Sequence, residues 1–248
     1  MRNGDVRSEN GTSVFEKTVD AARAIVTIAP PVHHLRSRWG TIIVLLSVVD
    51  PAWFLIANGV LHILRRDLSP ATHFISEYAV GRYGWLMASA LVILGCGTLS
   101  LSVGITTTLG KHPVGRVGTA ILGVSGIATV LIGLFRTDID GQPATLAGAI
   151  HGRAALIAIS FEAISVLVLT PVFFRNARWR PFRAVSGVLA VAVVLSIALY
   201  AVLPHGAGER LIVYTLVLWL FFAGVRLRKI VSWGGRIRPL MKSGGGML

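Results

Sequence analysis

The chain has 248 residues, of which 54% are hydrophobic and only 14% are charged. Soluble domains carry roughly 25% charged residues, so this composition excludes an ordinary soluble protein and indicates a membrane protein. The formal net charge of +13 would also suit a nucleic-acid-binding protein, but the basic residues cluster in the connections between apolar segments. We therefore expect membrane lipids as partners and no nucleic acid.

The first 40 residues are polar and charged, without an apolar stretch that leads to a small-residue cleavage site. We interpret residues 1–40 as a polar cytoplasmic tail. Residues 14–28 have some amphipathic character before Pro30 and Pro31, so a short interfacial helix and a loosely ordered tail are both open alternatives for this segment.

Six apolar segments follow the tail, and the connections between them are short. A helix needs roughly 20 apolar residues to cross a bilayer, and each segment approaches this length. Backbone polar groups find no water in lipid, which favours helices over an open sheet. The sequence predicts an all-α fold, an integral membrane bundle of six transmembrane helices within residues 41–229, followed by a basic cytoplasmic tail over residues 230–248. The predicted spans cover residues 41–61, 83–105, 117–135, 150–174, 184–203 and 211–225.

Basic residues gather on one side of the predicted bundle and acidic residues on the other. The tail, the second and fourth connections and the C-terminal segment hold most of the Lys and Arg residues, so the positive-inside rule predicts that both termini are cytoplasmic. An excess of Arg over Lys is typical of GC-rich bacteria, and we expect a multi-pass protein of a bacterial plasma membrane. The acids of the three outer connections are Asp67, Glu77, Asp138, Asp140 and Glu209.

The stretch HFISEY, residues 73–78, is the most polar part of the first outer connection. On a helix, positions i, i+3 and i+4 share a face, so His73, Ser76 and Glu77 would converge. In a functional interpretation, Glu77 is a catalytic acid or base, and His73 and Ser76 bind the substrate. In a structural interpretation, Ser76 or Ser69 caps the second span and Glu77 pairs with Arg82 or Arg66.

The second outer connection carries Asp138 and Asp140, and His151 opens the fourth span. Asp138 and His151 are candidate catalytic residues. Carboxylates and imidazoles also suit a divalent metal cofactor, although the sequence has neither an HExxH motif nor a histidine pair at i, i+4. A metal site is therefore an open alternative, and its candidate ligands are His73, Asp138, Asp140, His151 and His205.

Two carboxyl groups lie deep in predicted spans, Asp50 in the first and Glu162 in the fourth. Ionisable residues at this depth are costly unless they are paired or hydrated, so both are candidate catalytic residues, and a hydrogen-bonded packing role is the alternative. His151 and Glu162 are about three helical turns apart and share one stripe of the helix. Ala155 and Ala158 on that stripe favour close contact with the bundle interior.

Aromatic side chains also lie near the predicted depth of these carboxyl groups. Trp53 and Phe54 follow Asp50 by one turn, and Trp219 lies within the last span. Aromatic faces stabilise cations, such as those formed in terpenoid cyclisation. We therefore regard Trp53, Phe54 and Trp219 as candidate substrate-binding residues.

The polar connections and the spans beside them resemble a family of bacterial membrane proteins catalogued only as a domain of unknown function. The similarity covers residues 41–225 and is carried by the segments RRDLSPATHFISEY, GWLMASALVILG, GLFRTD and AIHGRAAL. Members of that family are similar six-helix bundles, with Ile-Ser-Glu after the first span, Phe-x-x-Asp after the third and a histidine that opens the fourth. The resemblance implies importance for Ser76, Glu77, Asp138 and His151, and it brings no established activity.

The chain differs in one feature from the family above and in another from a second group of membrane proteins. Tyr78 follows the Ser-Glu pair at a place where the family often has a smaller residue. A fainter likeness connects the chain with membrane hydrolases of the alkaline ceramidase type, but the chain lacks their paired histidines on one late helix. That second likeness serves only as an analogy for chemistry at a bundle mouth.

Three classes of function are open, and we rank them in order. The first is a membrane-embedded enzyme that acts on a hydrophobic small molecule, a lipid or isoprenoid, by carboxylate and histidine acid–base chemistry in the outer half of the bundle, as a terpene cyclase or a hydrolase. The second is a proton-coupled small-molecule transporter, because the first and fourth spans each carry one deep carboxyl group. The third is a non-catalytic membrane partner protein.

Overall fold

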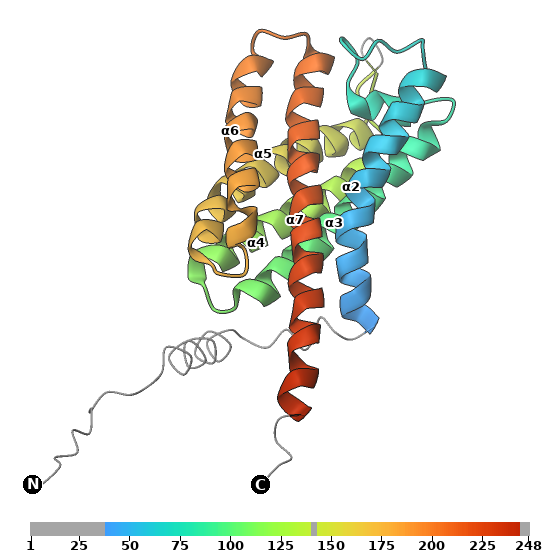
Figure 1. Cartoon of the computed structure of the whole chain (residues 1–248). Coiled ribbons are helices and arrows are strands. Elements are labelled where there is room, and N and C mark those ends of the chain that lie inside the picture. Colours follow the sequence, from blue (N-terminus) through green and yellow to red (C-terminus); the bar gives the residue numbers. More distant parts are fainter. Residues whose placement is uncertain (1–37, 140–142, 244–248) are drawn as a thin grey trace, which may run out of the picture. The chain divides into compact units, whose positions relative to one another are not determined.

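The computed structural model describes residues 38–139 and 143–243, and these residues form helices without any strand. All six α-helices contain a span long and apolar enough to cross a membrane, which confirms the predicted all-α bundle of six membrane-spanning helices. The predicted tail up to residue 37, with its amphipathic segment, lies outside the described residues. The helices are α2 (Arg38–Leu64), η2 (Ile75–Ala79), α3 (Gly84–Leu109), α4 (Pro113–Leu134), α5 (Leu146–Arg175), η3 (Arg180–Phe182), α6 (Arg183–Tyr200) and α7 (His205–Ser243), where η marks a short 3₁₀-helix (Figure 1).

The last helix differs most from its prediction. The apolar pattern predicts a span over 211–225, whereas α7 begins at His205 and continues through Ser243. Hydropathy detects only the part of a helix that faces lipid, while a helix can continue into the polar layer on either side. As a result, Glu209 and Arg210 belong to the first turns of α7, and the helix also enters the segment predicted as a tail.

Glycine, proline and polar caps set the ends of the central helices. Gly110 follows α3 with a φ of 68°, a backbone conformation that glycine adopts without strain. The next helix, α4, starts with Pro113, whose missing N–H is not needed in a first turn. At the start of α5 the Thr145 hydroxyl accepts a hydrogen bond from the Gly148 N–H at 3.0 Å. Each of these three helix ends lies four residues beyond the limit that the apolar pattern predicts, because the helix continues until a glycine, a proline or a cap ends it.

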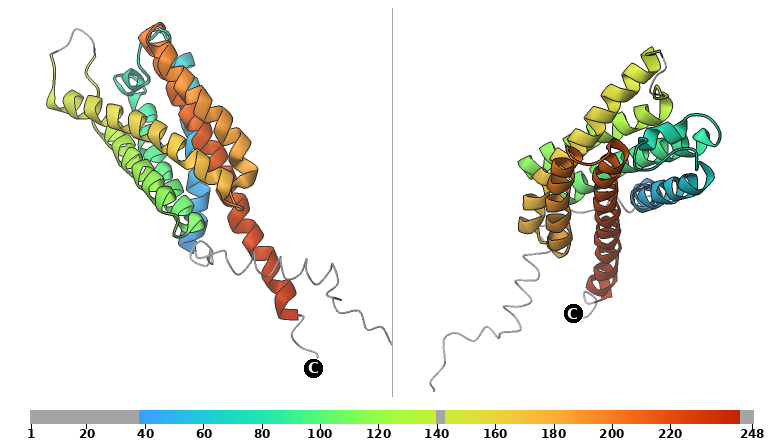
Figure 2. Two further views of the ribbon diagram at one scale, coloured as in Figure 1. Left: turned by 90° about the vertical axis from the view of Figure 1, so that its left-hand side faces the viewer. Right: turned by 90° about the horizontal axis from the view of Figure 1, so that it is seen from above.

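Helices that follow one another along the chain pack side by side, and α7 returns to pack against α2. The six helices therefore form a closed ring, in which α3 and α4 lie to one side of the α6 and α7 pair (Figure 2). Glycines allow the closest contact: a Cβ added to Gly95 on α3 would lie 2.7 Å from the Gly126 carbonyl oxygen on α4. Small residues permit this backbone approach between membrane helices.

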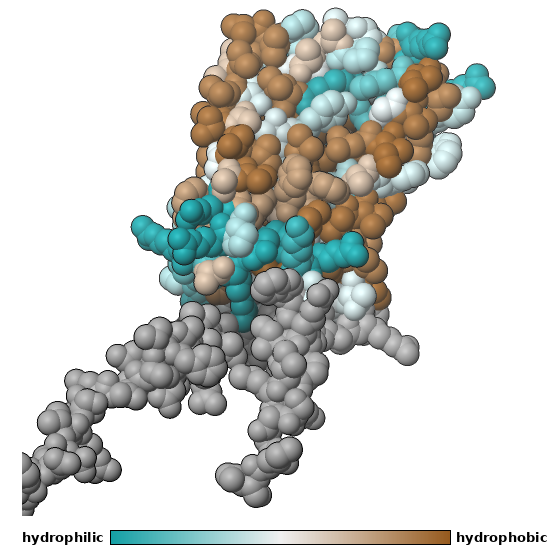
Figure 3. Space-filling view, in the orientation of Figure 1, coloured by the Kyte–Doolittle hydropathy of each residue, from teal (hydrophilic) through white to brown (hydrophobic). Residues whose placement is uncertain are grey.

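The ring has two chemically different ends. The α2–α3, α4–α5 and α6–α7 connections lie together at one end, here called the distal end, and α2 begins at the opposite, proximal end (Figure 1). Apolar side chains cover the helix surfaces between the ends, and hydrophilic side chains gather near the proximal end (Figure 3). Which end faces the cytoplasm stays a prediction, with the distal end predicted to be outside.

Candidate functional site

A small cavity lies inside the ring, and residues of α2, η2, α3, α4, α5 and α7 line it. It offers about 70 Å³ to water-sized molecules. Because one water needs roughly 10–15 Å³ in this measure, the cavity has room for about five to seven waters. Its lining is mostly apolar, with a few polar side chains. The lining residues are Phe54, Ile75, Ser76, Leu91, Leu94, Thr129, Ile132, His151, Ala155, Ala158, Ile159, Glu162, Glu209, Val213, Leu216 and Val217.

His151 presents an unused ring nitrogen to this cavity. Its side chain is only 3% exposed, and its Nδ1 lies 2.8 Å from the Phe135 carbonyl oxygen. Since a carbonyl oxygen can only accept, Nδ1 carries the proton and Nε2 of the neutral ring has a free lone pair. This Nε2 is buried and has no hydrogen-bond partner. His151 can therefore accept a proton or a hydrogen bond from a molecule in the cavity.

Glu162 lies deeper on the same helix and also has an unused polar atom. Its Oε2 lies 3.5 Å from the Ser125 hydroxyl oxygen on α4, while its buried Oε1 has no hydrogen-bond partner. At a rise of about 1.5 Å per residue, the backbones of His151 and Glu162 are roughly 16 Å apart along α5. Two buried polar groups thus mark the two ends of one apolar slot, as their shared stripe predicts.

The α2–α3 connection borders the distal end of the cavity, and two consecutive residues of α7 hold this connection in place. The Ile75 N–H donates to Glu209 Oε2 at 2.6 Å, and Arg210 Nη1 donates to the His73 carbonyl oxygen at 2.6 Å. Ile75 and Ser76 of this connection line the cavity. The connection therefore forms the distal wall of the cavity, and the first turns of α7 position it.

Arg210 is itself buried, with 6% of its surface exposed. Its Nε lies 3.3 Å from His62 Nε2 on α2, and its guanidinium carbon lies 5.4 Å from the centre of the Tyr78 ring. A cation over an aromatic face is stabilised by the ring quadrupole. Arg210 therefore joins α2, α7 and η2 at the distal end.

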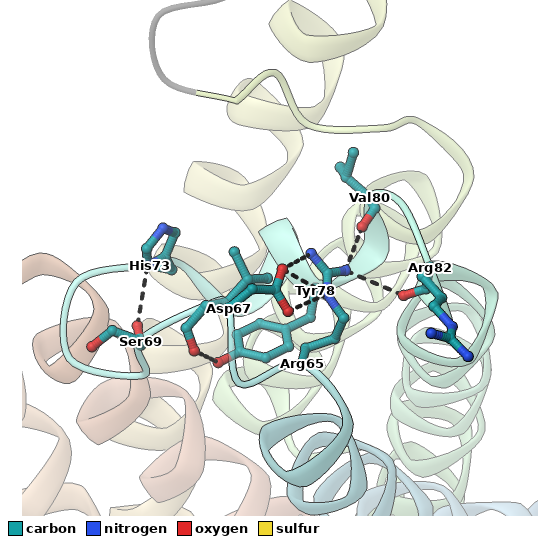
Figure 4. A network of polar contacts seen from close by, with 8 residues as sticks. Arg65, Asp67, Ser69, His73, Tyr78, Val80 and Arg82 are labelled. Atoms are coloured by element: carbon teal, nitrogen blue, oxygen red, sulfur yellow. Dashed lines mark hydrogen bonds and ion pairs between the residues drawn. The ribbon is translucent and has the colours of Figure 1, made fainter.

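A second polar network fixes the outer part of the same connection (Figure 4). Arg65 forms an ion pair with Asp67 at 2.8 Å and donates from Nη1 to the carbonyl oxygens of Val80 and Arg82. The Arg65 guanidinium lowers the pKa of Asp67, and the hydrogen bond with Asp67 raises the pKa of Arg65. The Tyr78 hydroxyl donates to the Leu68 carbonyl oxygen at 2.9 Å. Burial raises the pKa of Tyr78.

The expected convergence of His73, Ser76 and Glu77 on one helical face is wrong, because the segment is not an α-helix. Only Ile75–Ala79 is helical, as a short 3₁₀-helix, and His73 precedes it. Glu77 Oε1 accepts a hydrogen bond from the Phe74 N–H at 2.9 Å, which is a capping contact. His73 Nδ1 lies 3.3 Å from the Ser69 carbonyl oxygen (Figure 4). Of the three residues, only Ser76 lines the cavity.

Asp138 organises the start of α5. Its Oδ1 accepts from the Thr145 hydroxyl at 2.7 Å and its Oδ2 from the Thr145 N–H at 2.9 Å. These two hydrogen bonds lower the pKa of Asp138. Among the described residues, no hydrogen bond joins Asp138, Glu77 and His151 to one another, so the structure gives them separate immediate partners.

Asp50 lies on α2 outside the cavity lining, with 1% of its surface exposed. Its carboxyl group packs directly against Gly97 of α3, where an added Cβ would lie 1.4 Å from Asp50 Oδ2. Asp50 Oδ1 and Trp53 Nε1 are buried without hydrogen-bond partners. Asp50 is near enough to Glu162 for an electrostatic interaction. Asp50 is thus a second deep carboxyl group, on α2, one helical turn before Phe54 of the cavity lining.

Trp219 lies in an aromatic cluster rather than at the cavity. Its ring stacks on Phe173 with centroids 6.2 Å apart, and its Nε1 donates to the Ser186 hydroxyl at 3.0 Å. Trp179 and Phe182 complete this cluster. Phe54 is the aromatic residue, of the three predicted for substrate binding, that lines the cavity.

The metal candidates do not form a common site in the part of the chain that the structure describes. No three His, Cys, Asp or Glu side chains there come close enough to hold a metal ion. His205 lies beside the Phe74 and Tyr200 rings, with centroid distances of 6.3 and 6.2 Å. Asp140 lies outside the described residues.

Sequence reasoning did not select Glu209 and Arg210 as site residues. It placed both in a connection, because the last apolar run begins directly after them. The usable signal was the adjacent pair of opposite charges at the start of a membrane helix, where charged side chains are retained for specific contacts.

Comparison with known proteins identifies the family of the chain. No curated protein and no solved structure gives a match. The profile of a family described as "Protein of unknown function (DUF998)" matches residues 48–226. This range includes all or part of each of the six membrane-spanning helices, and it includes every polar residue that lines the cavity. The resemblance inferred from the polar connections is thereby confirmed, and the chain belongs to the DUF998 family.

Proposed function

We propose that this membrane protein is an acid–base enzyme that isomerises an unsaturated lipid or isoprenoid chain held in the cavity. The observation that carries the proposal is the pair of unpartnered buried atoms, His151 Nε2 and Glu162 Oε1, on the wall of one apolar cavity. Buried polar atoms are nearly always hydrogen-bonded in folded proteins. Two such atoms in one cavity are expected to meet a ligand or ordered water.

The separation of these two groups favours isomerisation over hydrolysis. Hydrolysis of one ester or amide bond requires an acid and a base within roughly 3 Å of the same few atoms. Groups that lie roughly 16 Å apart along α5 instead address opposite ends of an extended molecule. An acid at one end and a base at the other are the requirements of a terpene-cyclase-like reaction, in which a cation forms at one end and is quenched at the other.

In this proposal Glu162 adds a proton to a carbon–carbon double bond at the inner end of the chain. The resulting carbocation is relayed along the chain by attack of further double bonds, and Phe54 offers an aromatic face beside its path. His151 Nε2 then removes a proton from the distal end, which restores a double bond. One proton enters and one leaves, so the product is an isomer of the substrate.

The size of the cavity supports a slender substrate. Drug-sized ligands occupy pockets of roughly 300–1,000 Å³, whereas this cavity offers about 70 Å³. A single linear chain that replaces a row of waters fits such a slot better than a bulky ring system. Ring closure would then require α5 and α7 to separate locally.

A proton-coupled transporter is the second candidate, and Asp50 is the observation that favours it. Its unpartnered Oδ1 lies on α2, outside the cavity, and the carboxyl group interacts with Glu162. Carboxyl groups in succession can pass protons through a membrane protein. An enzyme of the proposed kind has no evident use for this second deep carboxyl group.

The test uses the full chain reconstituted in liposomes in deuterated water, with farnesol as the substrate and mass spectrometry as the readout. An isomerase yields a product that has exchanged one hydrogen for deuterium, and the substitution Glu162→Gln removes this product. Glu77→Gln is the matched control, since Glu77 caps η2 outside the cavity lining and an amide oxygen can still accept from the Phe74 N–H.

Two results would contradict the proposal. A product that has gained the elements of water would assign a hydratase. Uptake of unchanged substrate that follows an imposed pH gradient, and that both Asp50→Asn and Glu162→Gln abolish, would assign the transporter.

A further inference from the structure

Among the described residues, none of the polar side chains that line the cavity is a lysine or an arginine. His151 Nε2 is an acceptor, Glu162 and Glu209 supply carboxyl oxygens, and Thr129 already donates its hydroxyl hydrogen to a backbone carbonyl. The described residues of the lining therefore offer imidazole, hydroxyl and carboxyl groups and no lysine or arginine.

An anionic group would be disfavoured in such a place. It would lose its hydration, face the Glu209 carboxyl group, and find no opposite charge within the lining. The effective penalty for an ion buried without a partner is several kcal/mol. Phosphate recognition normally uses Arg, Lys or the backbone N–H groups of a helix start.

The guanidinium group of Arg210 does not make the cavity favourable for an anion. Arg210 follows Glu209 along α7 but does not line the cavity. Its Nη1 donates to the carbonyl oxygens of His73 and Gly206, and its Nε lies against His62. Its guanidinium carbon also lies 5.4 Å from the centre of the Tyr78 ring. Only Nη2 has no hydrogen-bond partner.

We propose that the cavity selects an uncharged chain, a hydrocarbon or an alcohol without a phosphate group, and that a hydroxyl at its distal end donates to the acceptors around the mouth. This inference rests on the proposed function and narrows its substrate class. The Ser76 hydroxyl and the Glu209 carboxyl group lie at the wall that the α2–α3 connection forms, so they and His151 are the groups such a hydroxyl would meet.

The test compares two probes that share a chain and differ only in the head group, farnesol and farnesyl diphosphate. Binding of each to the unmodified full chain in lipid nanodiscs is measured by native mass spectrometry and by the shift in melting temperature. We expect farnesol to bind at least tenfold more tightly than farnesyl diphosphate. Because the comparison uses the unmodified protein, it does not depend on whether a variant folds.

Substitutions then test which residues cause the preference for farnesol over farnesyl diphosphate. Glu209→Gln replaces a carboxyl group of the lining with a neutral amide, and it should weaken the discrimination against the diphosphate. Arg153→Gln replaces an exposed arginine of α5 that lies outside the lining, and it should leave the preference for farnesol unchanged. Diphosphate binding that equals or exceeds farnesol binding, and that Arg210→Gln abolishes, would overturn the inference and assign Arg210 as an anion site.

Failure of this inference and failure of the proposed function give different results. Tight, selective farnesol binding without any deuterated isomer would keep the inference and reject the isomerase. Conversion of the diphosphate to an isomer would keep the isomerase and reject the inference. Binding of neither probe would overturn the inference, since an uncharged chain of this length is what the slot is proposed to take.

Discussion

The Phe135 carbonyl oxygen accepts a hydrogen bond from His151 Nδ1 at 2.8 Å and thereby fixes which ring nitrogen faces the cavity. Phe135 directly follows α4 and His151 lies in the second turn of α5, so the α4–α5 connection itself orients the ring. The second nitrogen, Nε2, is buried without a hydrogen-bond partner. A backbone carbonyl does not titrate, which makes it a constant orienting group for the imidazole.

This contact predicts the tautomer of His151. In ¹⁵N-labelled protein at neutral pH, we expect His151 to carry its proton on Nδ1, whereas most histidines in water carry it on Nε2. ¹⁵N chemical shifts of the ring nitrogens measure this directly, with His151→Gln to assign the signal and His205 as an exposed comparison. A protonated Nε2 with a bare Nδ1 would show that the Phe135 contact is not formed.

We predict that the missing side chain of Gly97 leaves the space that the Asp50 carboxyl group occupies. A Cβ at position 97 would lie 1.4 Å from Asp50 Oδ2, so Gly97→Ala must displace a buried carboxyl group. We expect destabilisation of about 1–3 kcal/mol, the usual cost of overpacking, measured by unfolding in detergent. Gly59→Ala on α2 is the matched control, because nothing lies within 4 Å of its added Cβ. Equal stability of the two variants would contradict the close packing of Asp50 on α3.

We predict that the stability of the protein depends on pH through the Asp138 carboxylate at the start of α5. Its folded-state pKa is lowered by the two hydrogen bonds from Thr145. A group of this kind contributes stability above its unfolded pKa, about 3.9, and loses the contribution as pH falls through the lower folded-state value. The melting temperature of the unmodified protein should therefore drop more steeply below about pH 4 than that of Asp138→Asn. Parallel curves would show that the carboxylate is not needed there.

We predict that Glu209 and Arg210 hold the α2–α3 connection in its folded position. Hydrogen bonds to charged groups contribute roughly 1.5–3 kcal/mol, so removal of either side chain should speed amide exchange in residues 71–76 by about tenfold or more. Hydrogen exchange of Glu209→Ala and Arg210→Leu measures this effect. Arg153→Leu, an exposed arginine on α5, serves as the control and should leave exchange in the connection unchanged.

The orientation of the bundle is predicted from its charges. We expect the distal end to face outward and both termini to be cytoplasmic. In a Cys96→Ala background, a cysteine at the exposed Thr72 should react with an impermeant thiol reagent in intact cells, and one at the exposed Ala177 should not. Labelling at Ala177 alone would reverse the orientation and place the mouth of the cavity on the cytoplasmic side.

The sequence by itself determined the number, approximate limits and helical nature of the membrane spans. Composition and segment length decide these features, because lipid leaves the backbone no partner other than itself. The sequence also placed His151 and Glu162 on one inward stripe of α5, since both lie in one uninterrupted helix whose geometry is fixed. The structure brings these two residues to the same cavity.

Only the tertiary structure decided which polar residues share that cavity. Glu77 and Asp138 look like catalytic carboxylates in the sequence, yet their oxygens accept from Phe74 and Thr145. Glu209 was passed over, yet it lines the cavity. Short connections adopt turns and 3₁₀ geometry that hydropathy does not encode, and the pairing of α7 with the α2–α3 connection joins residues far apart in the chain. Long-range contacts of this kind depend on how six helices pack into a ring, and no single segment specifies that packing.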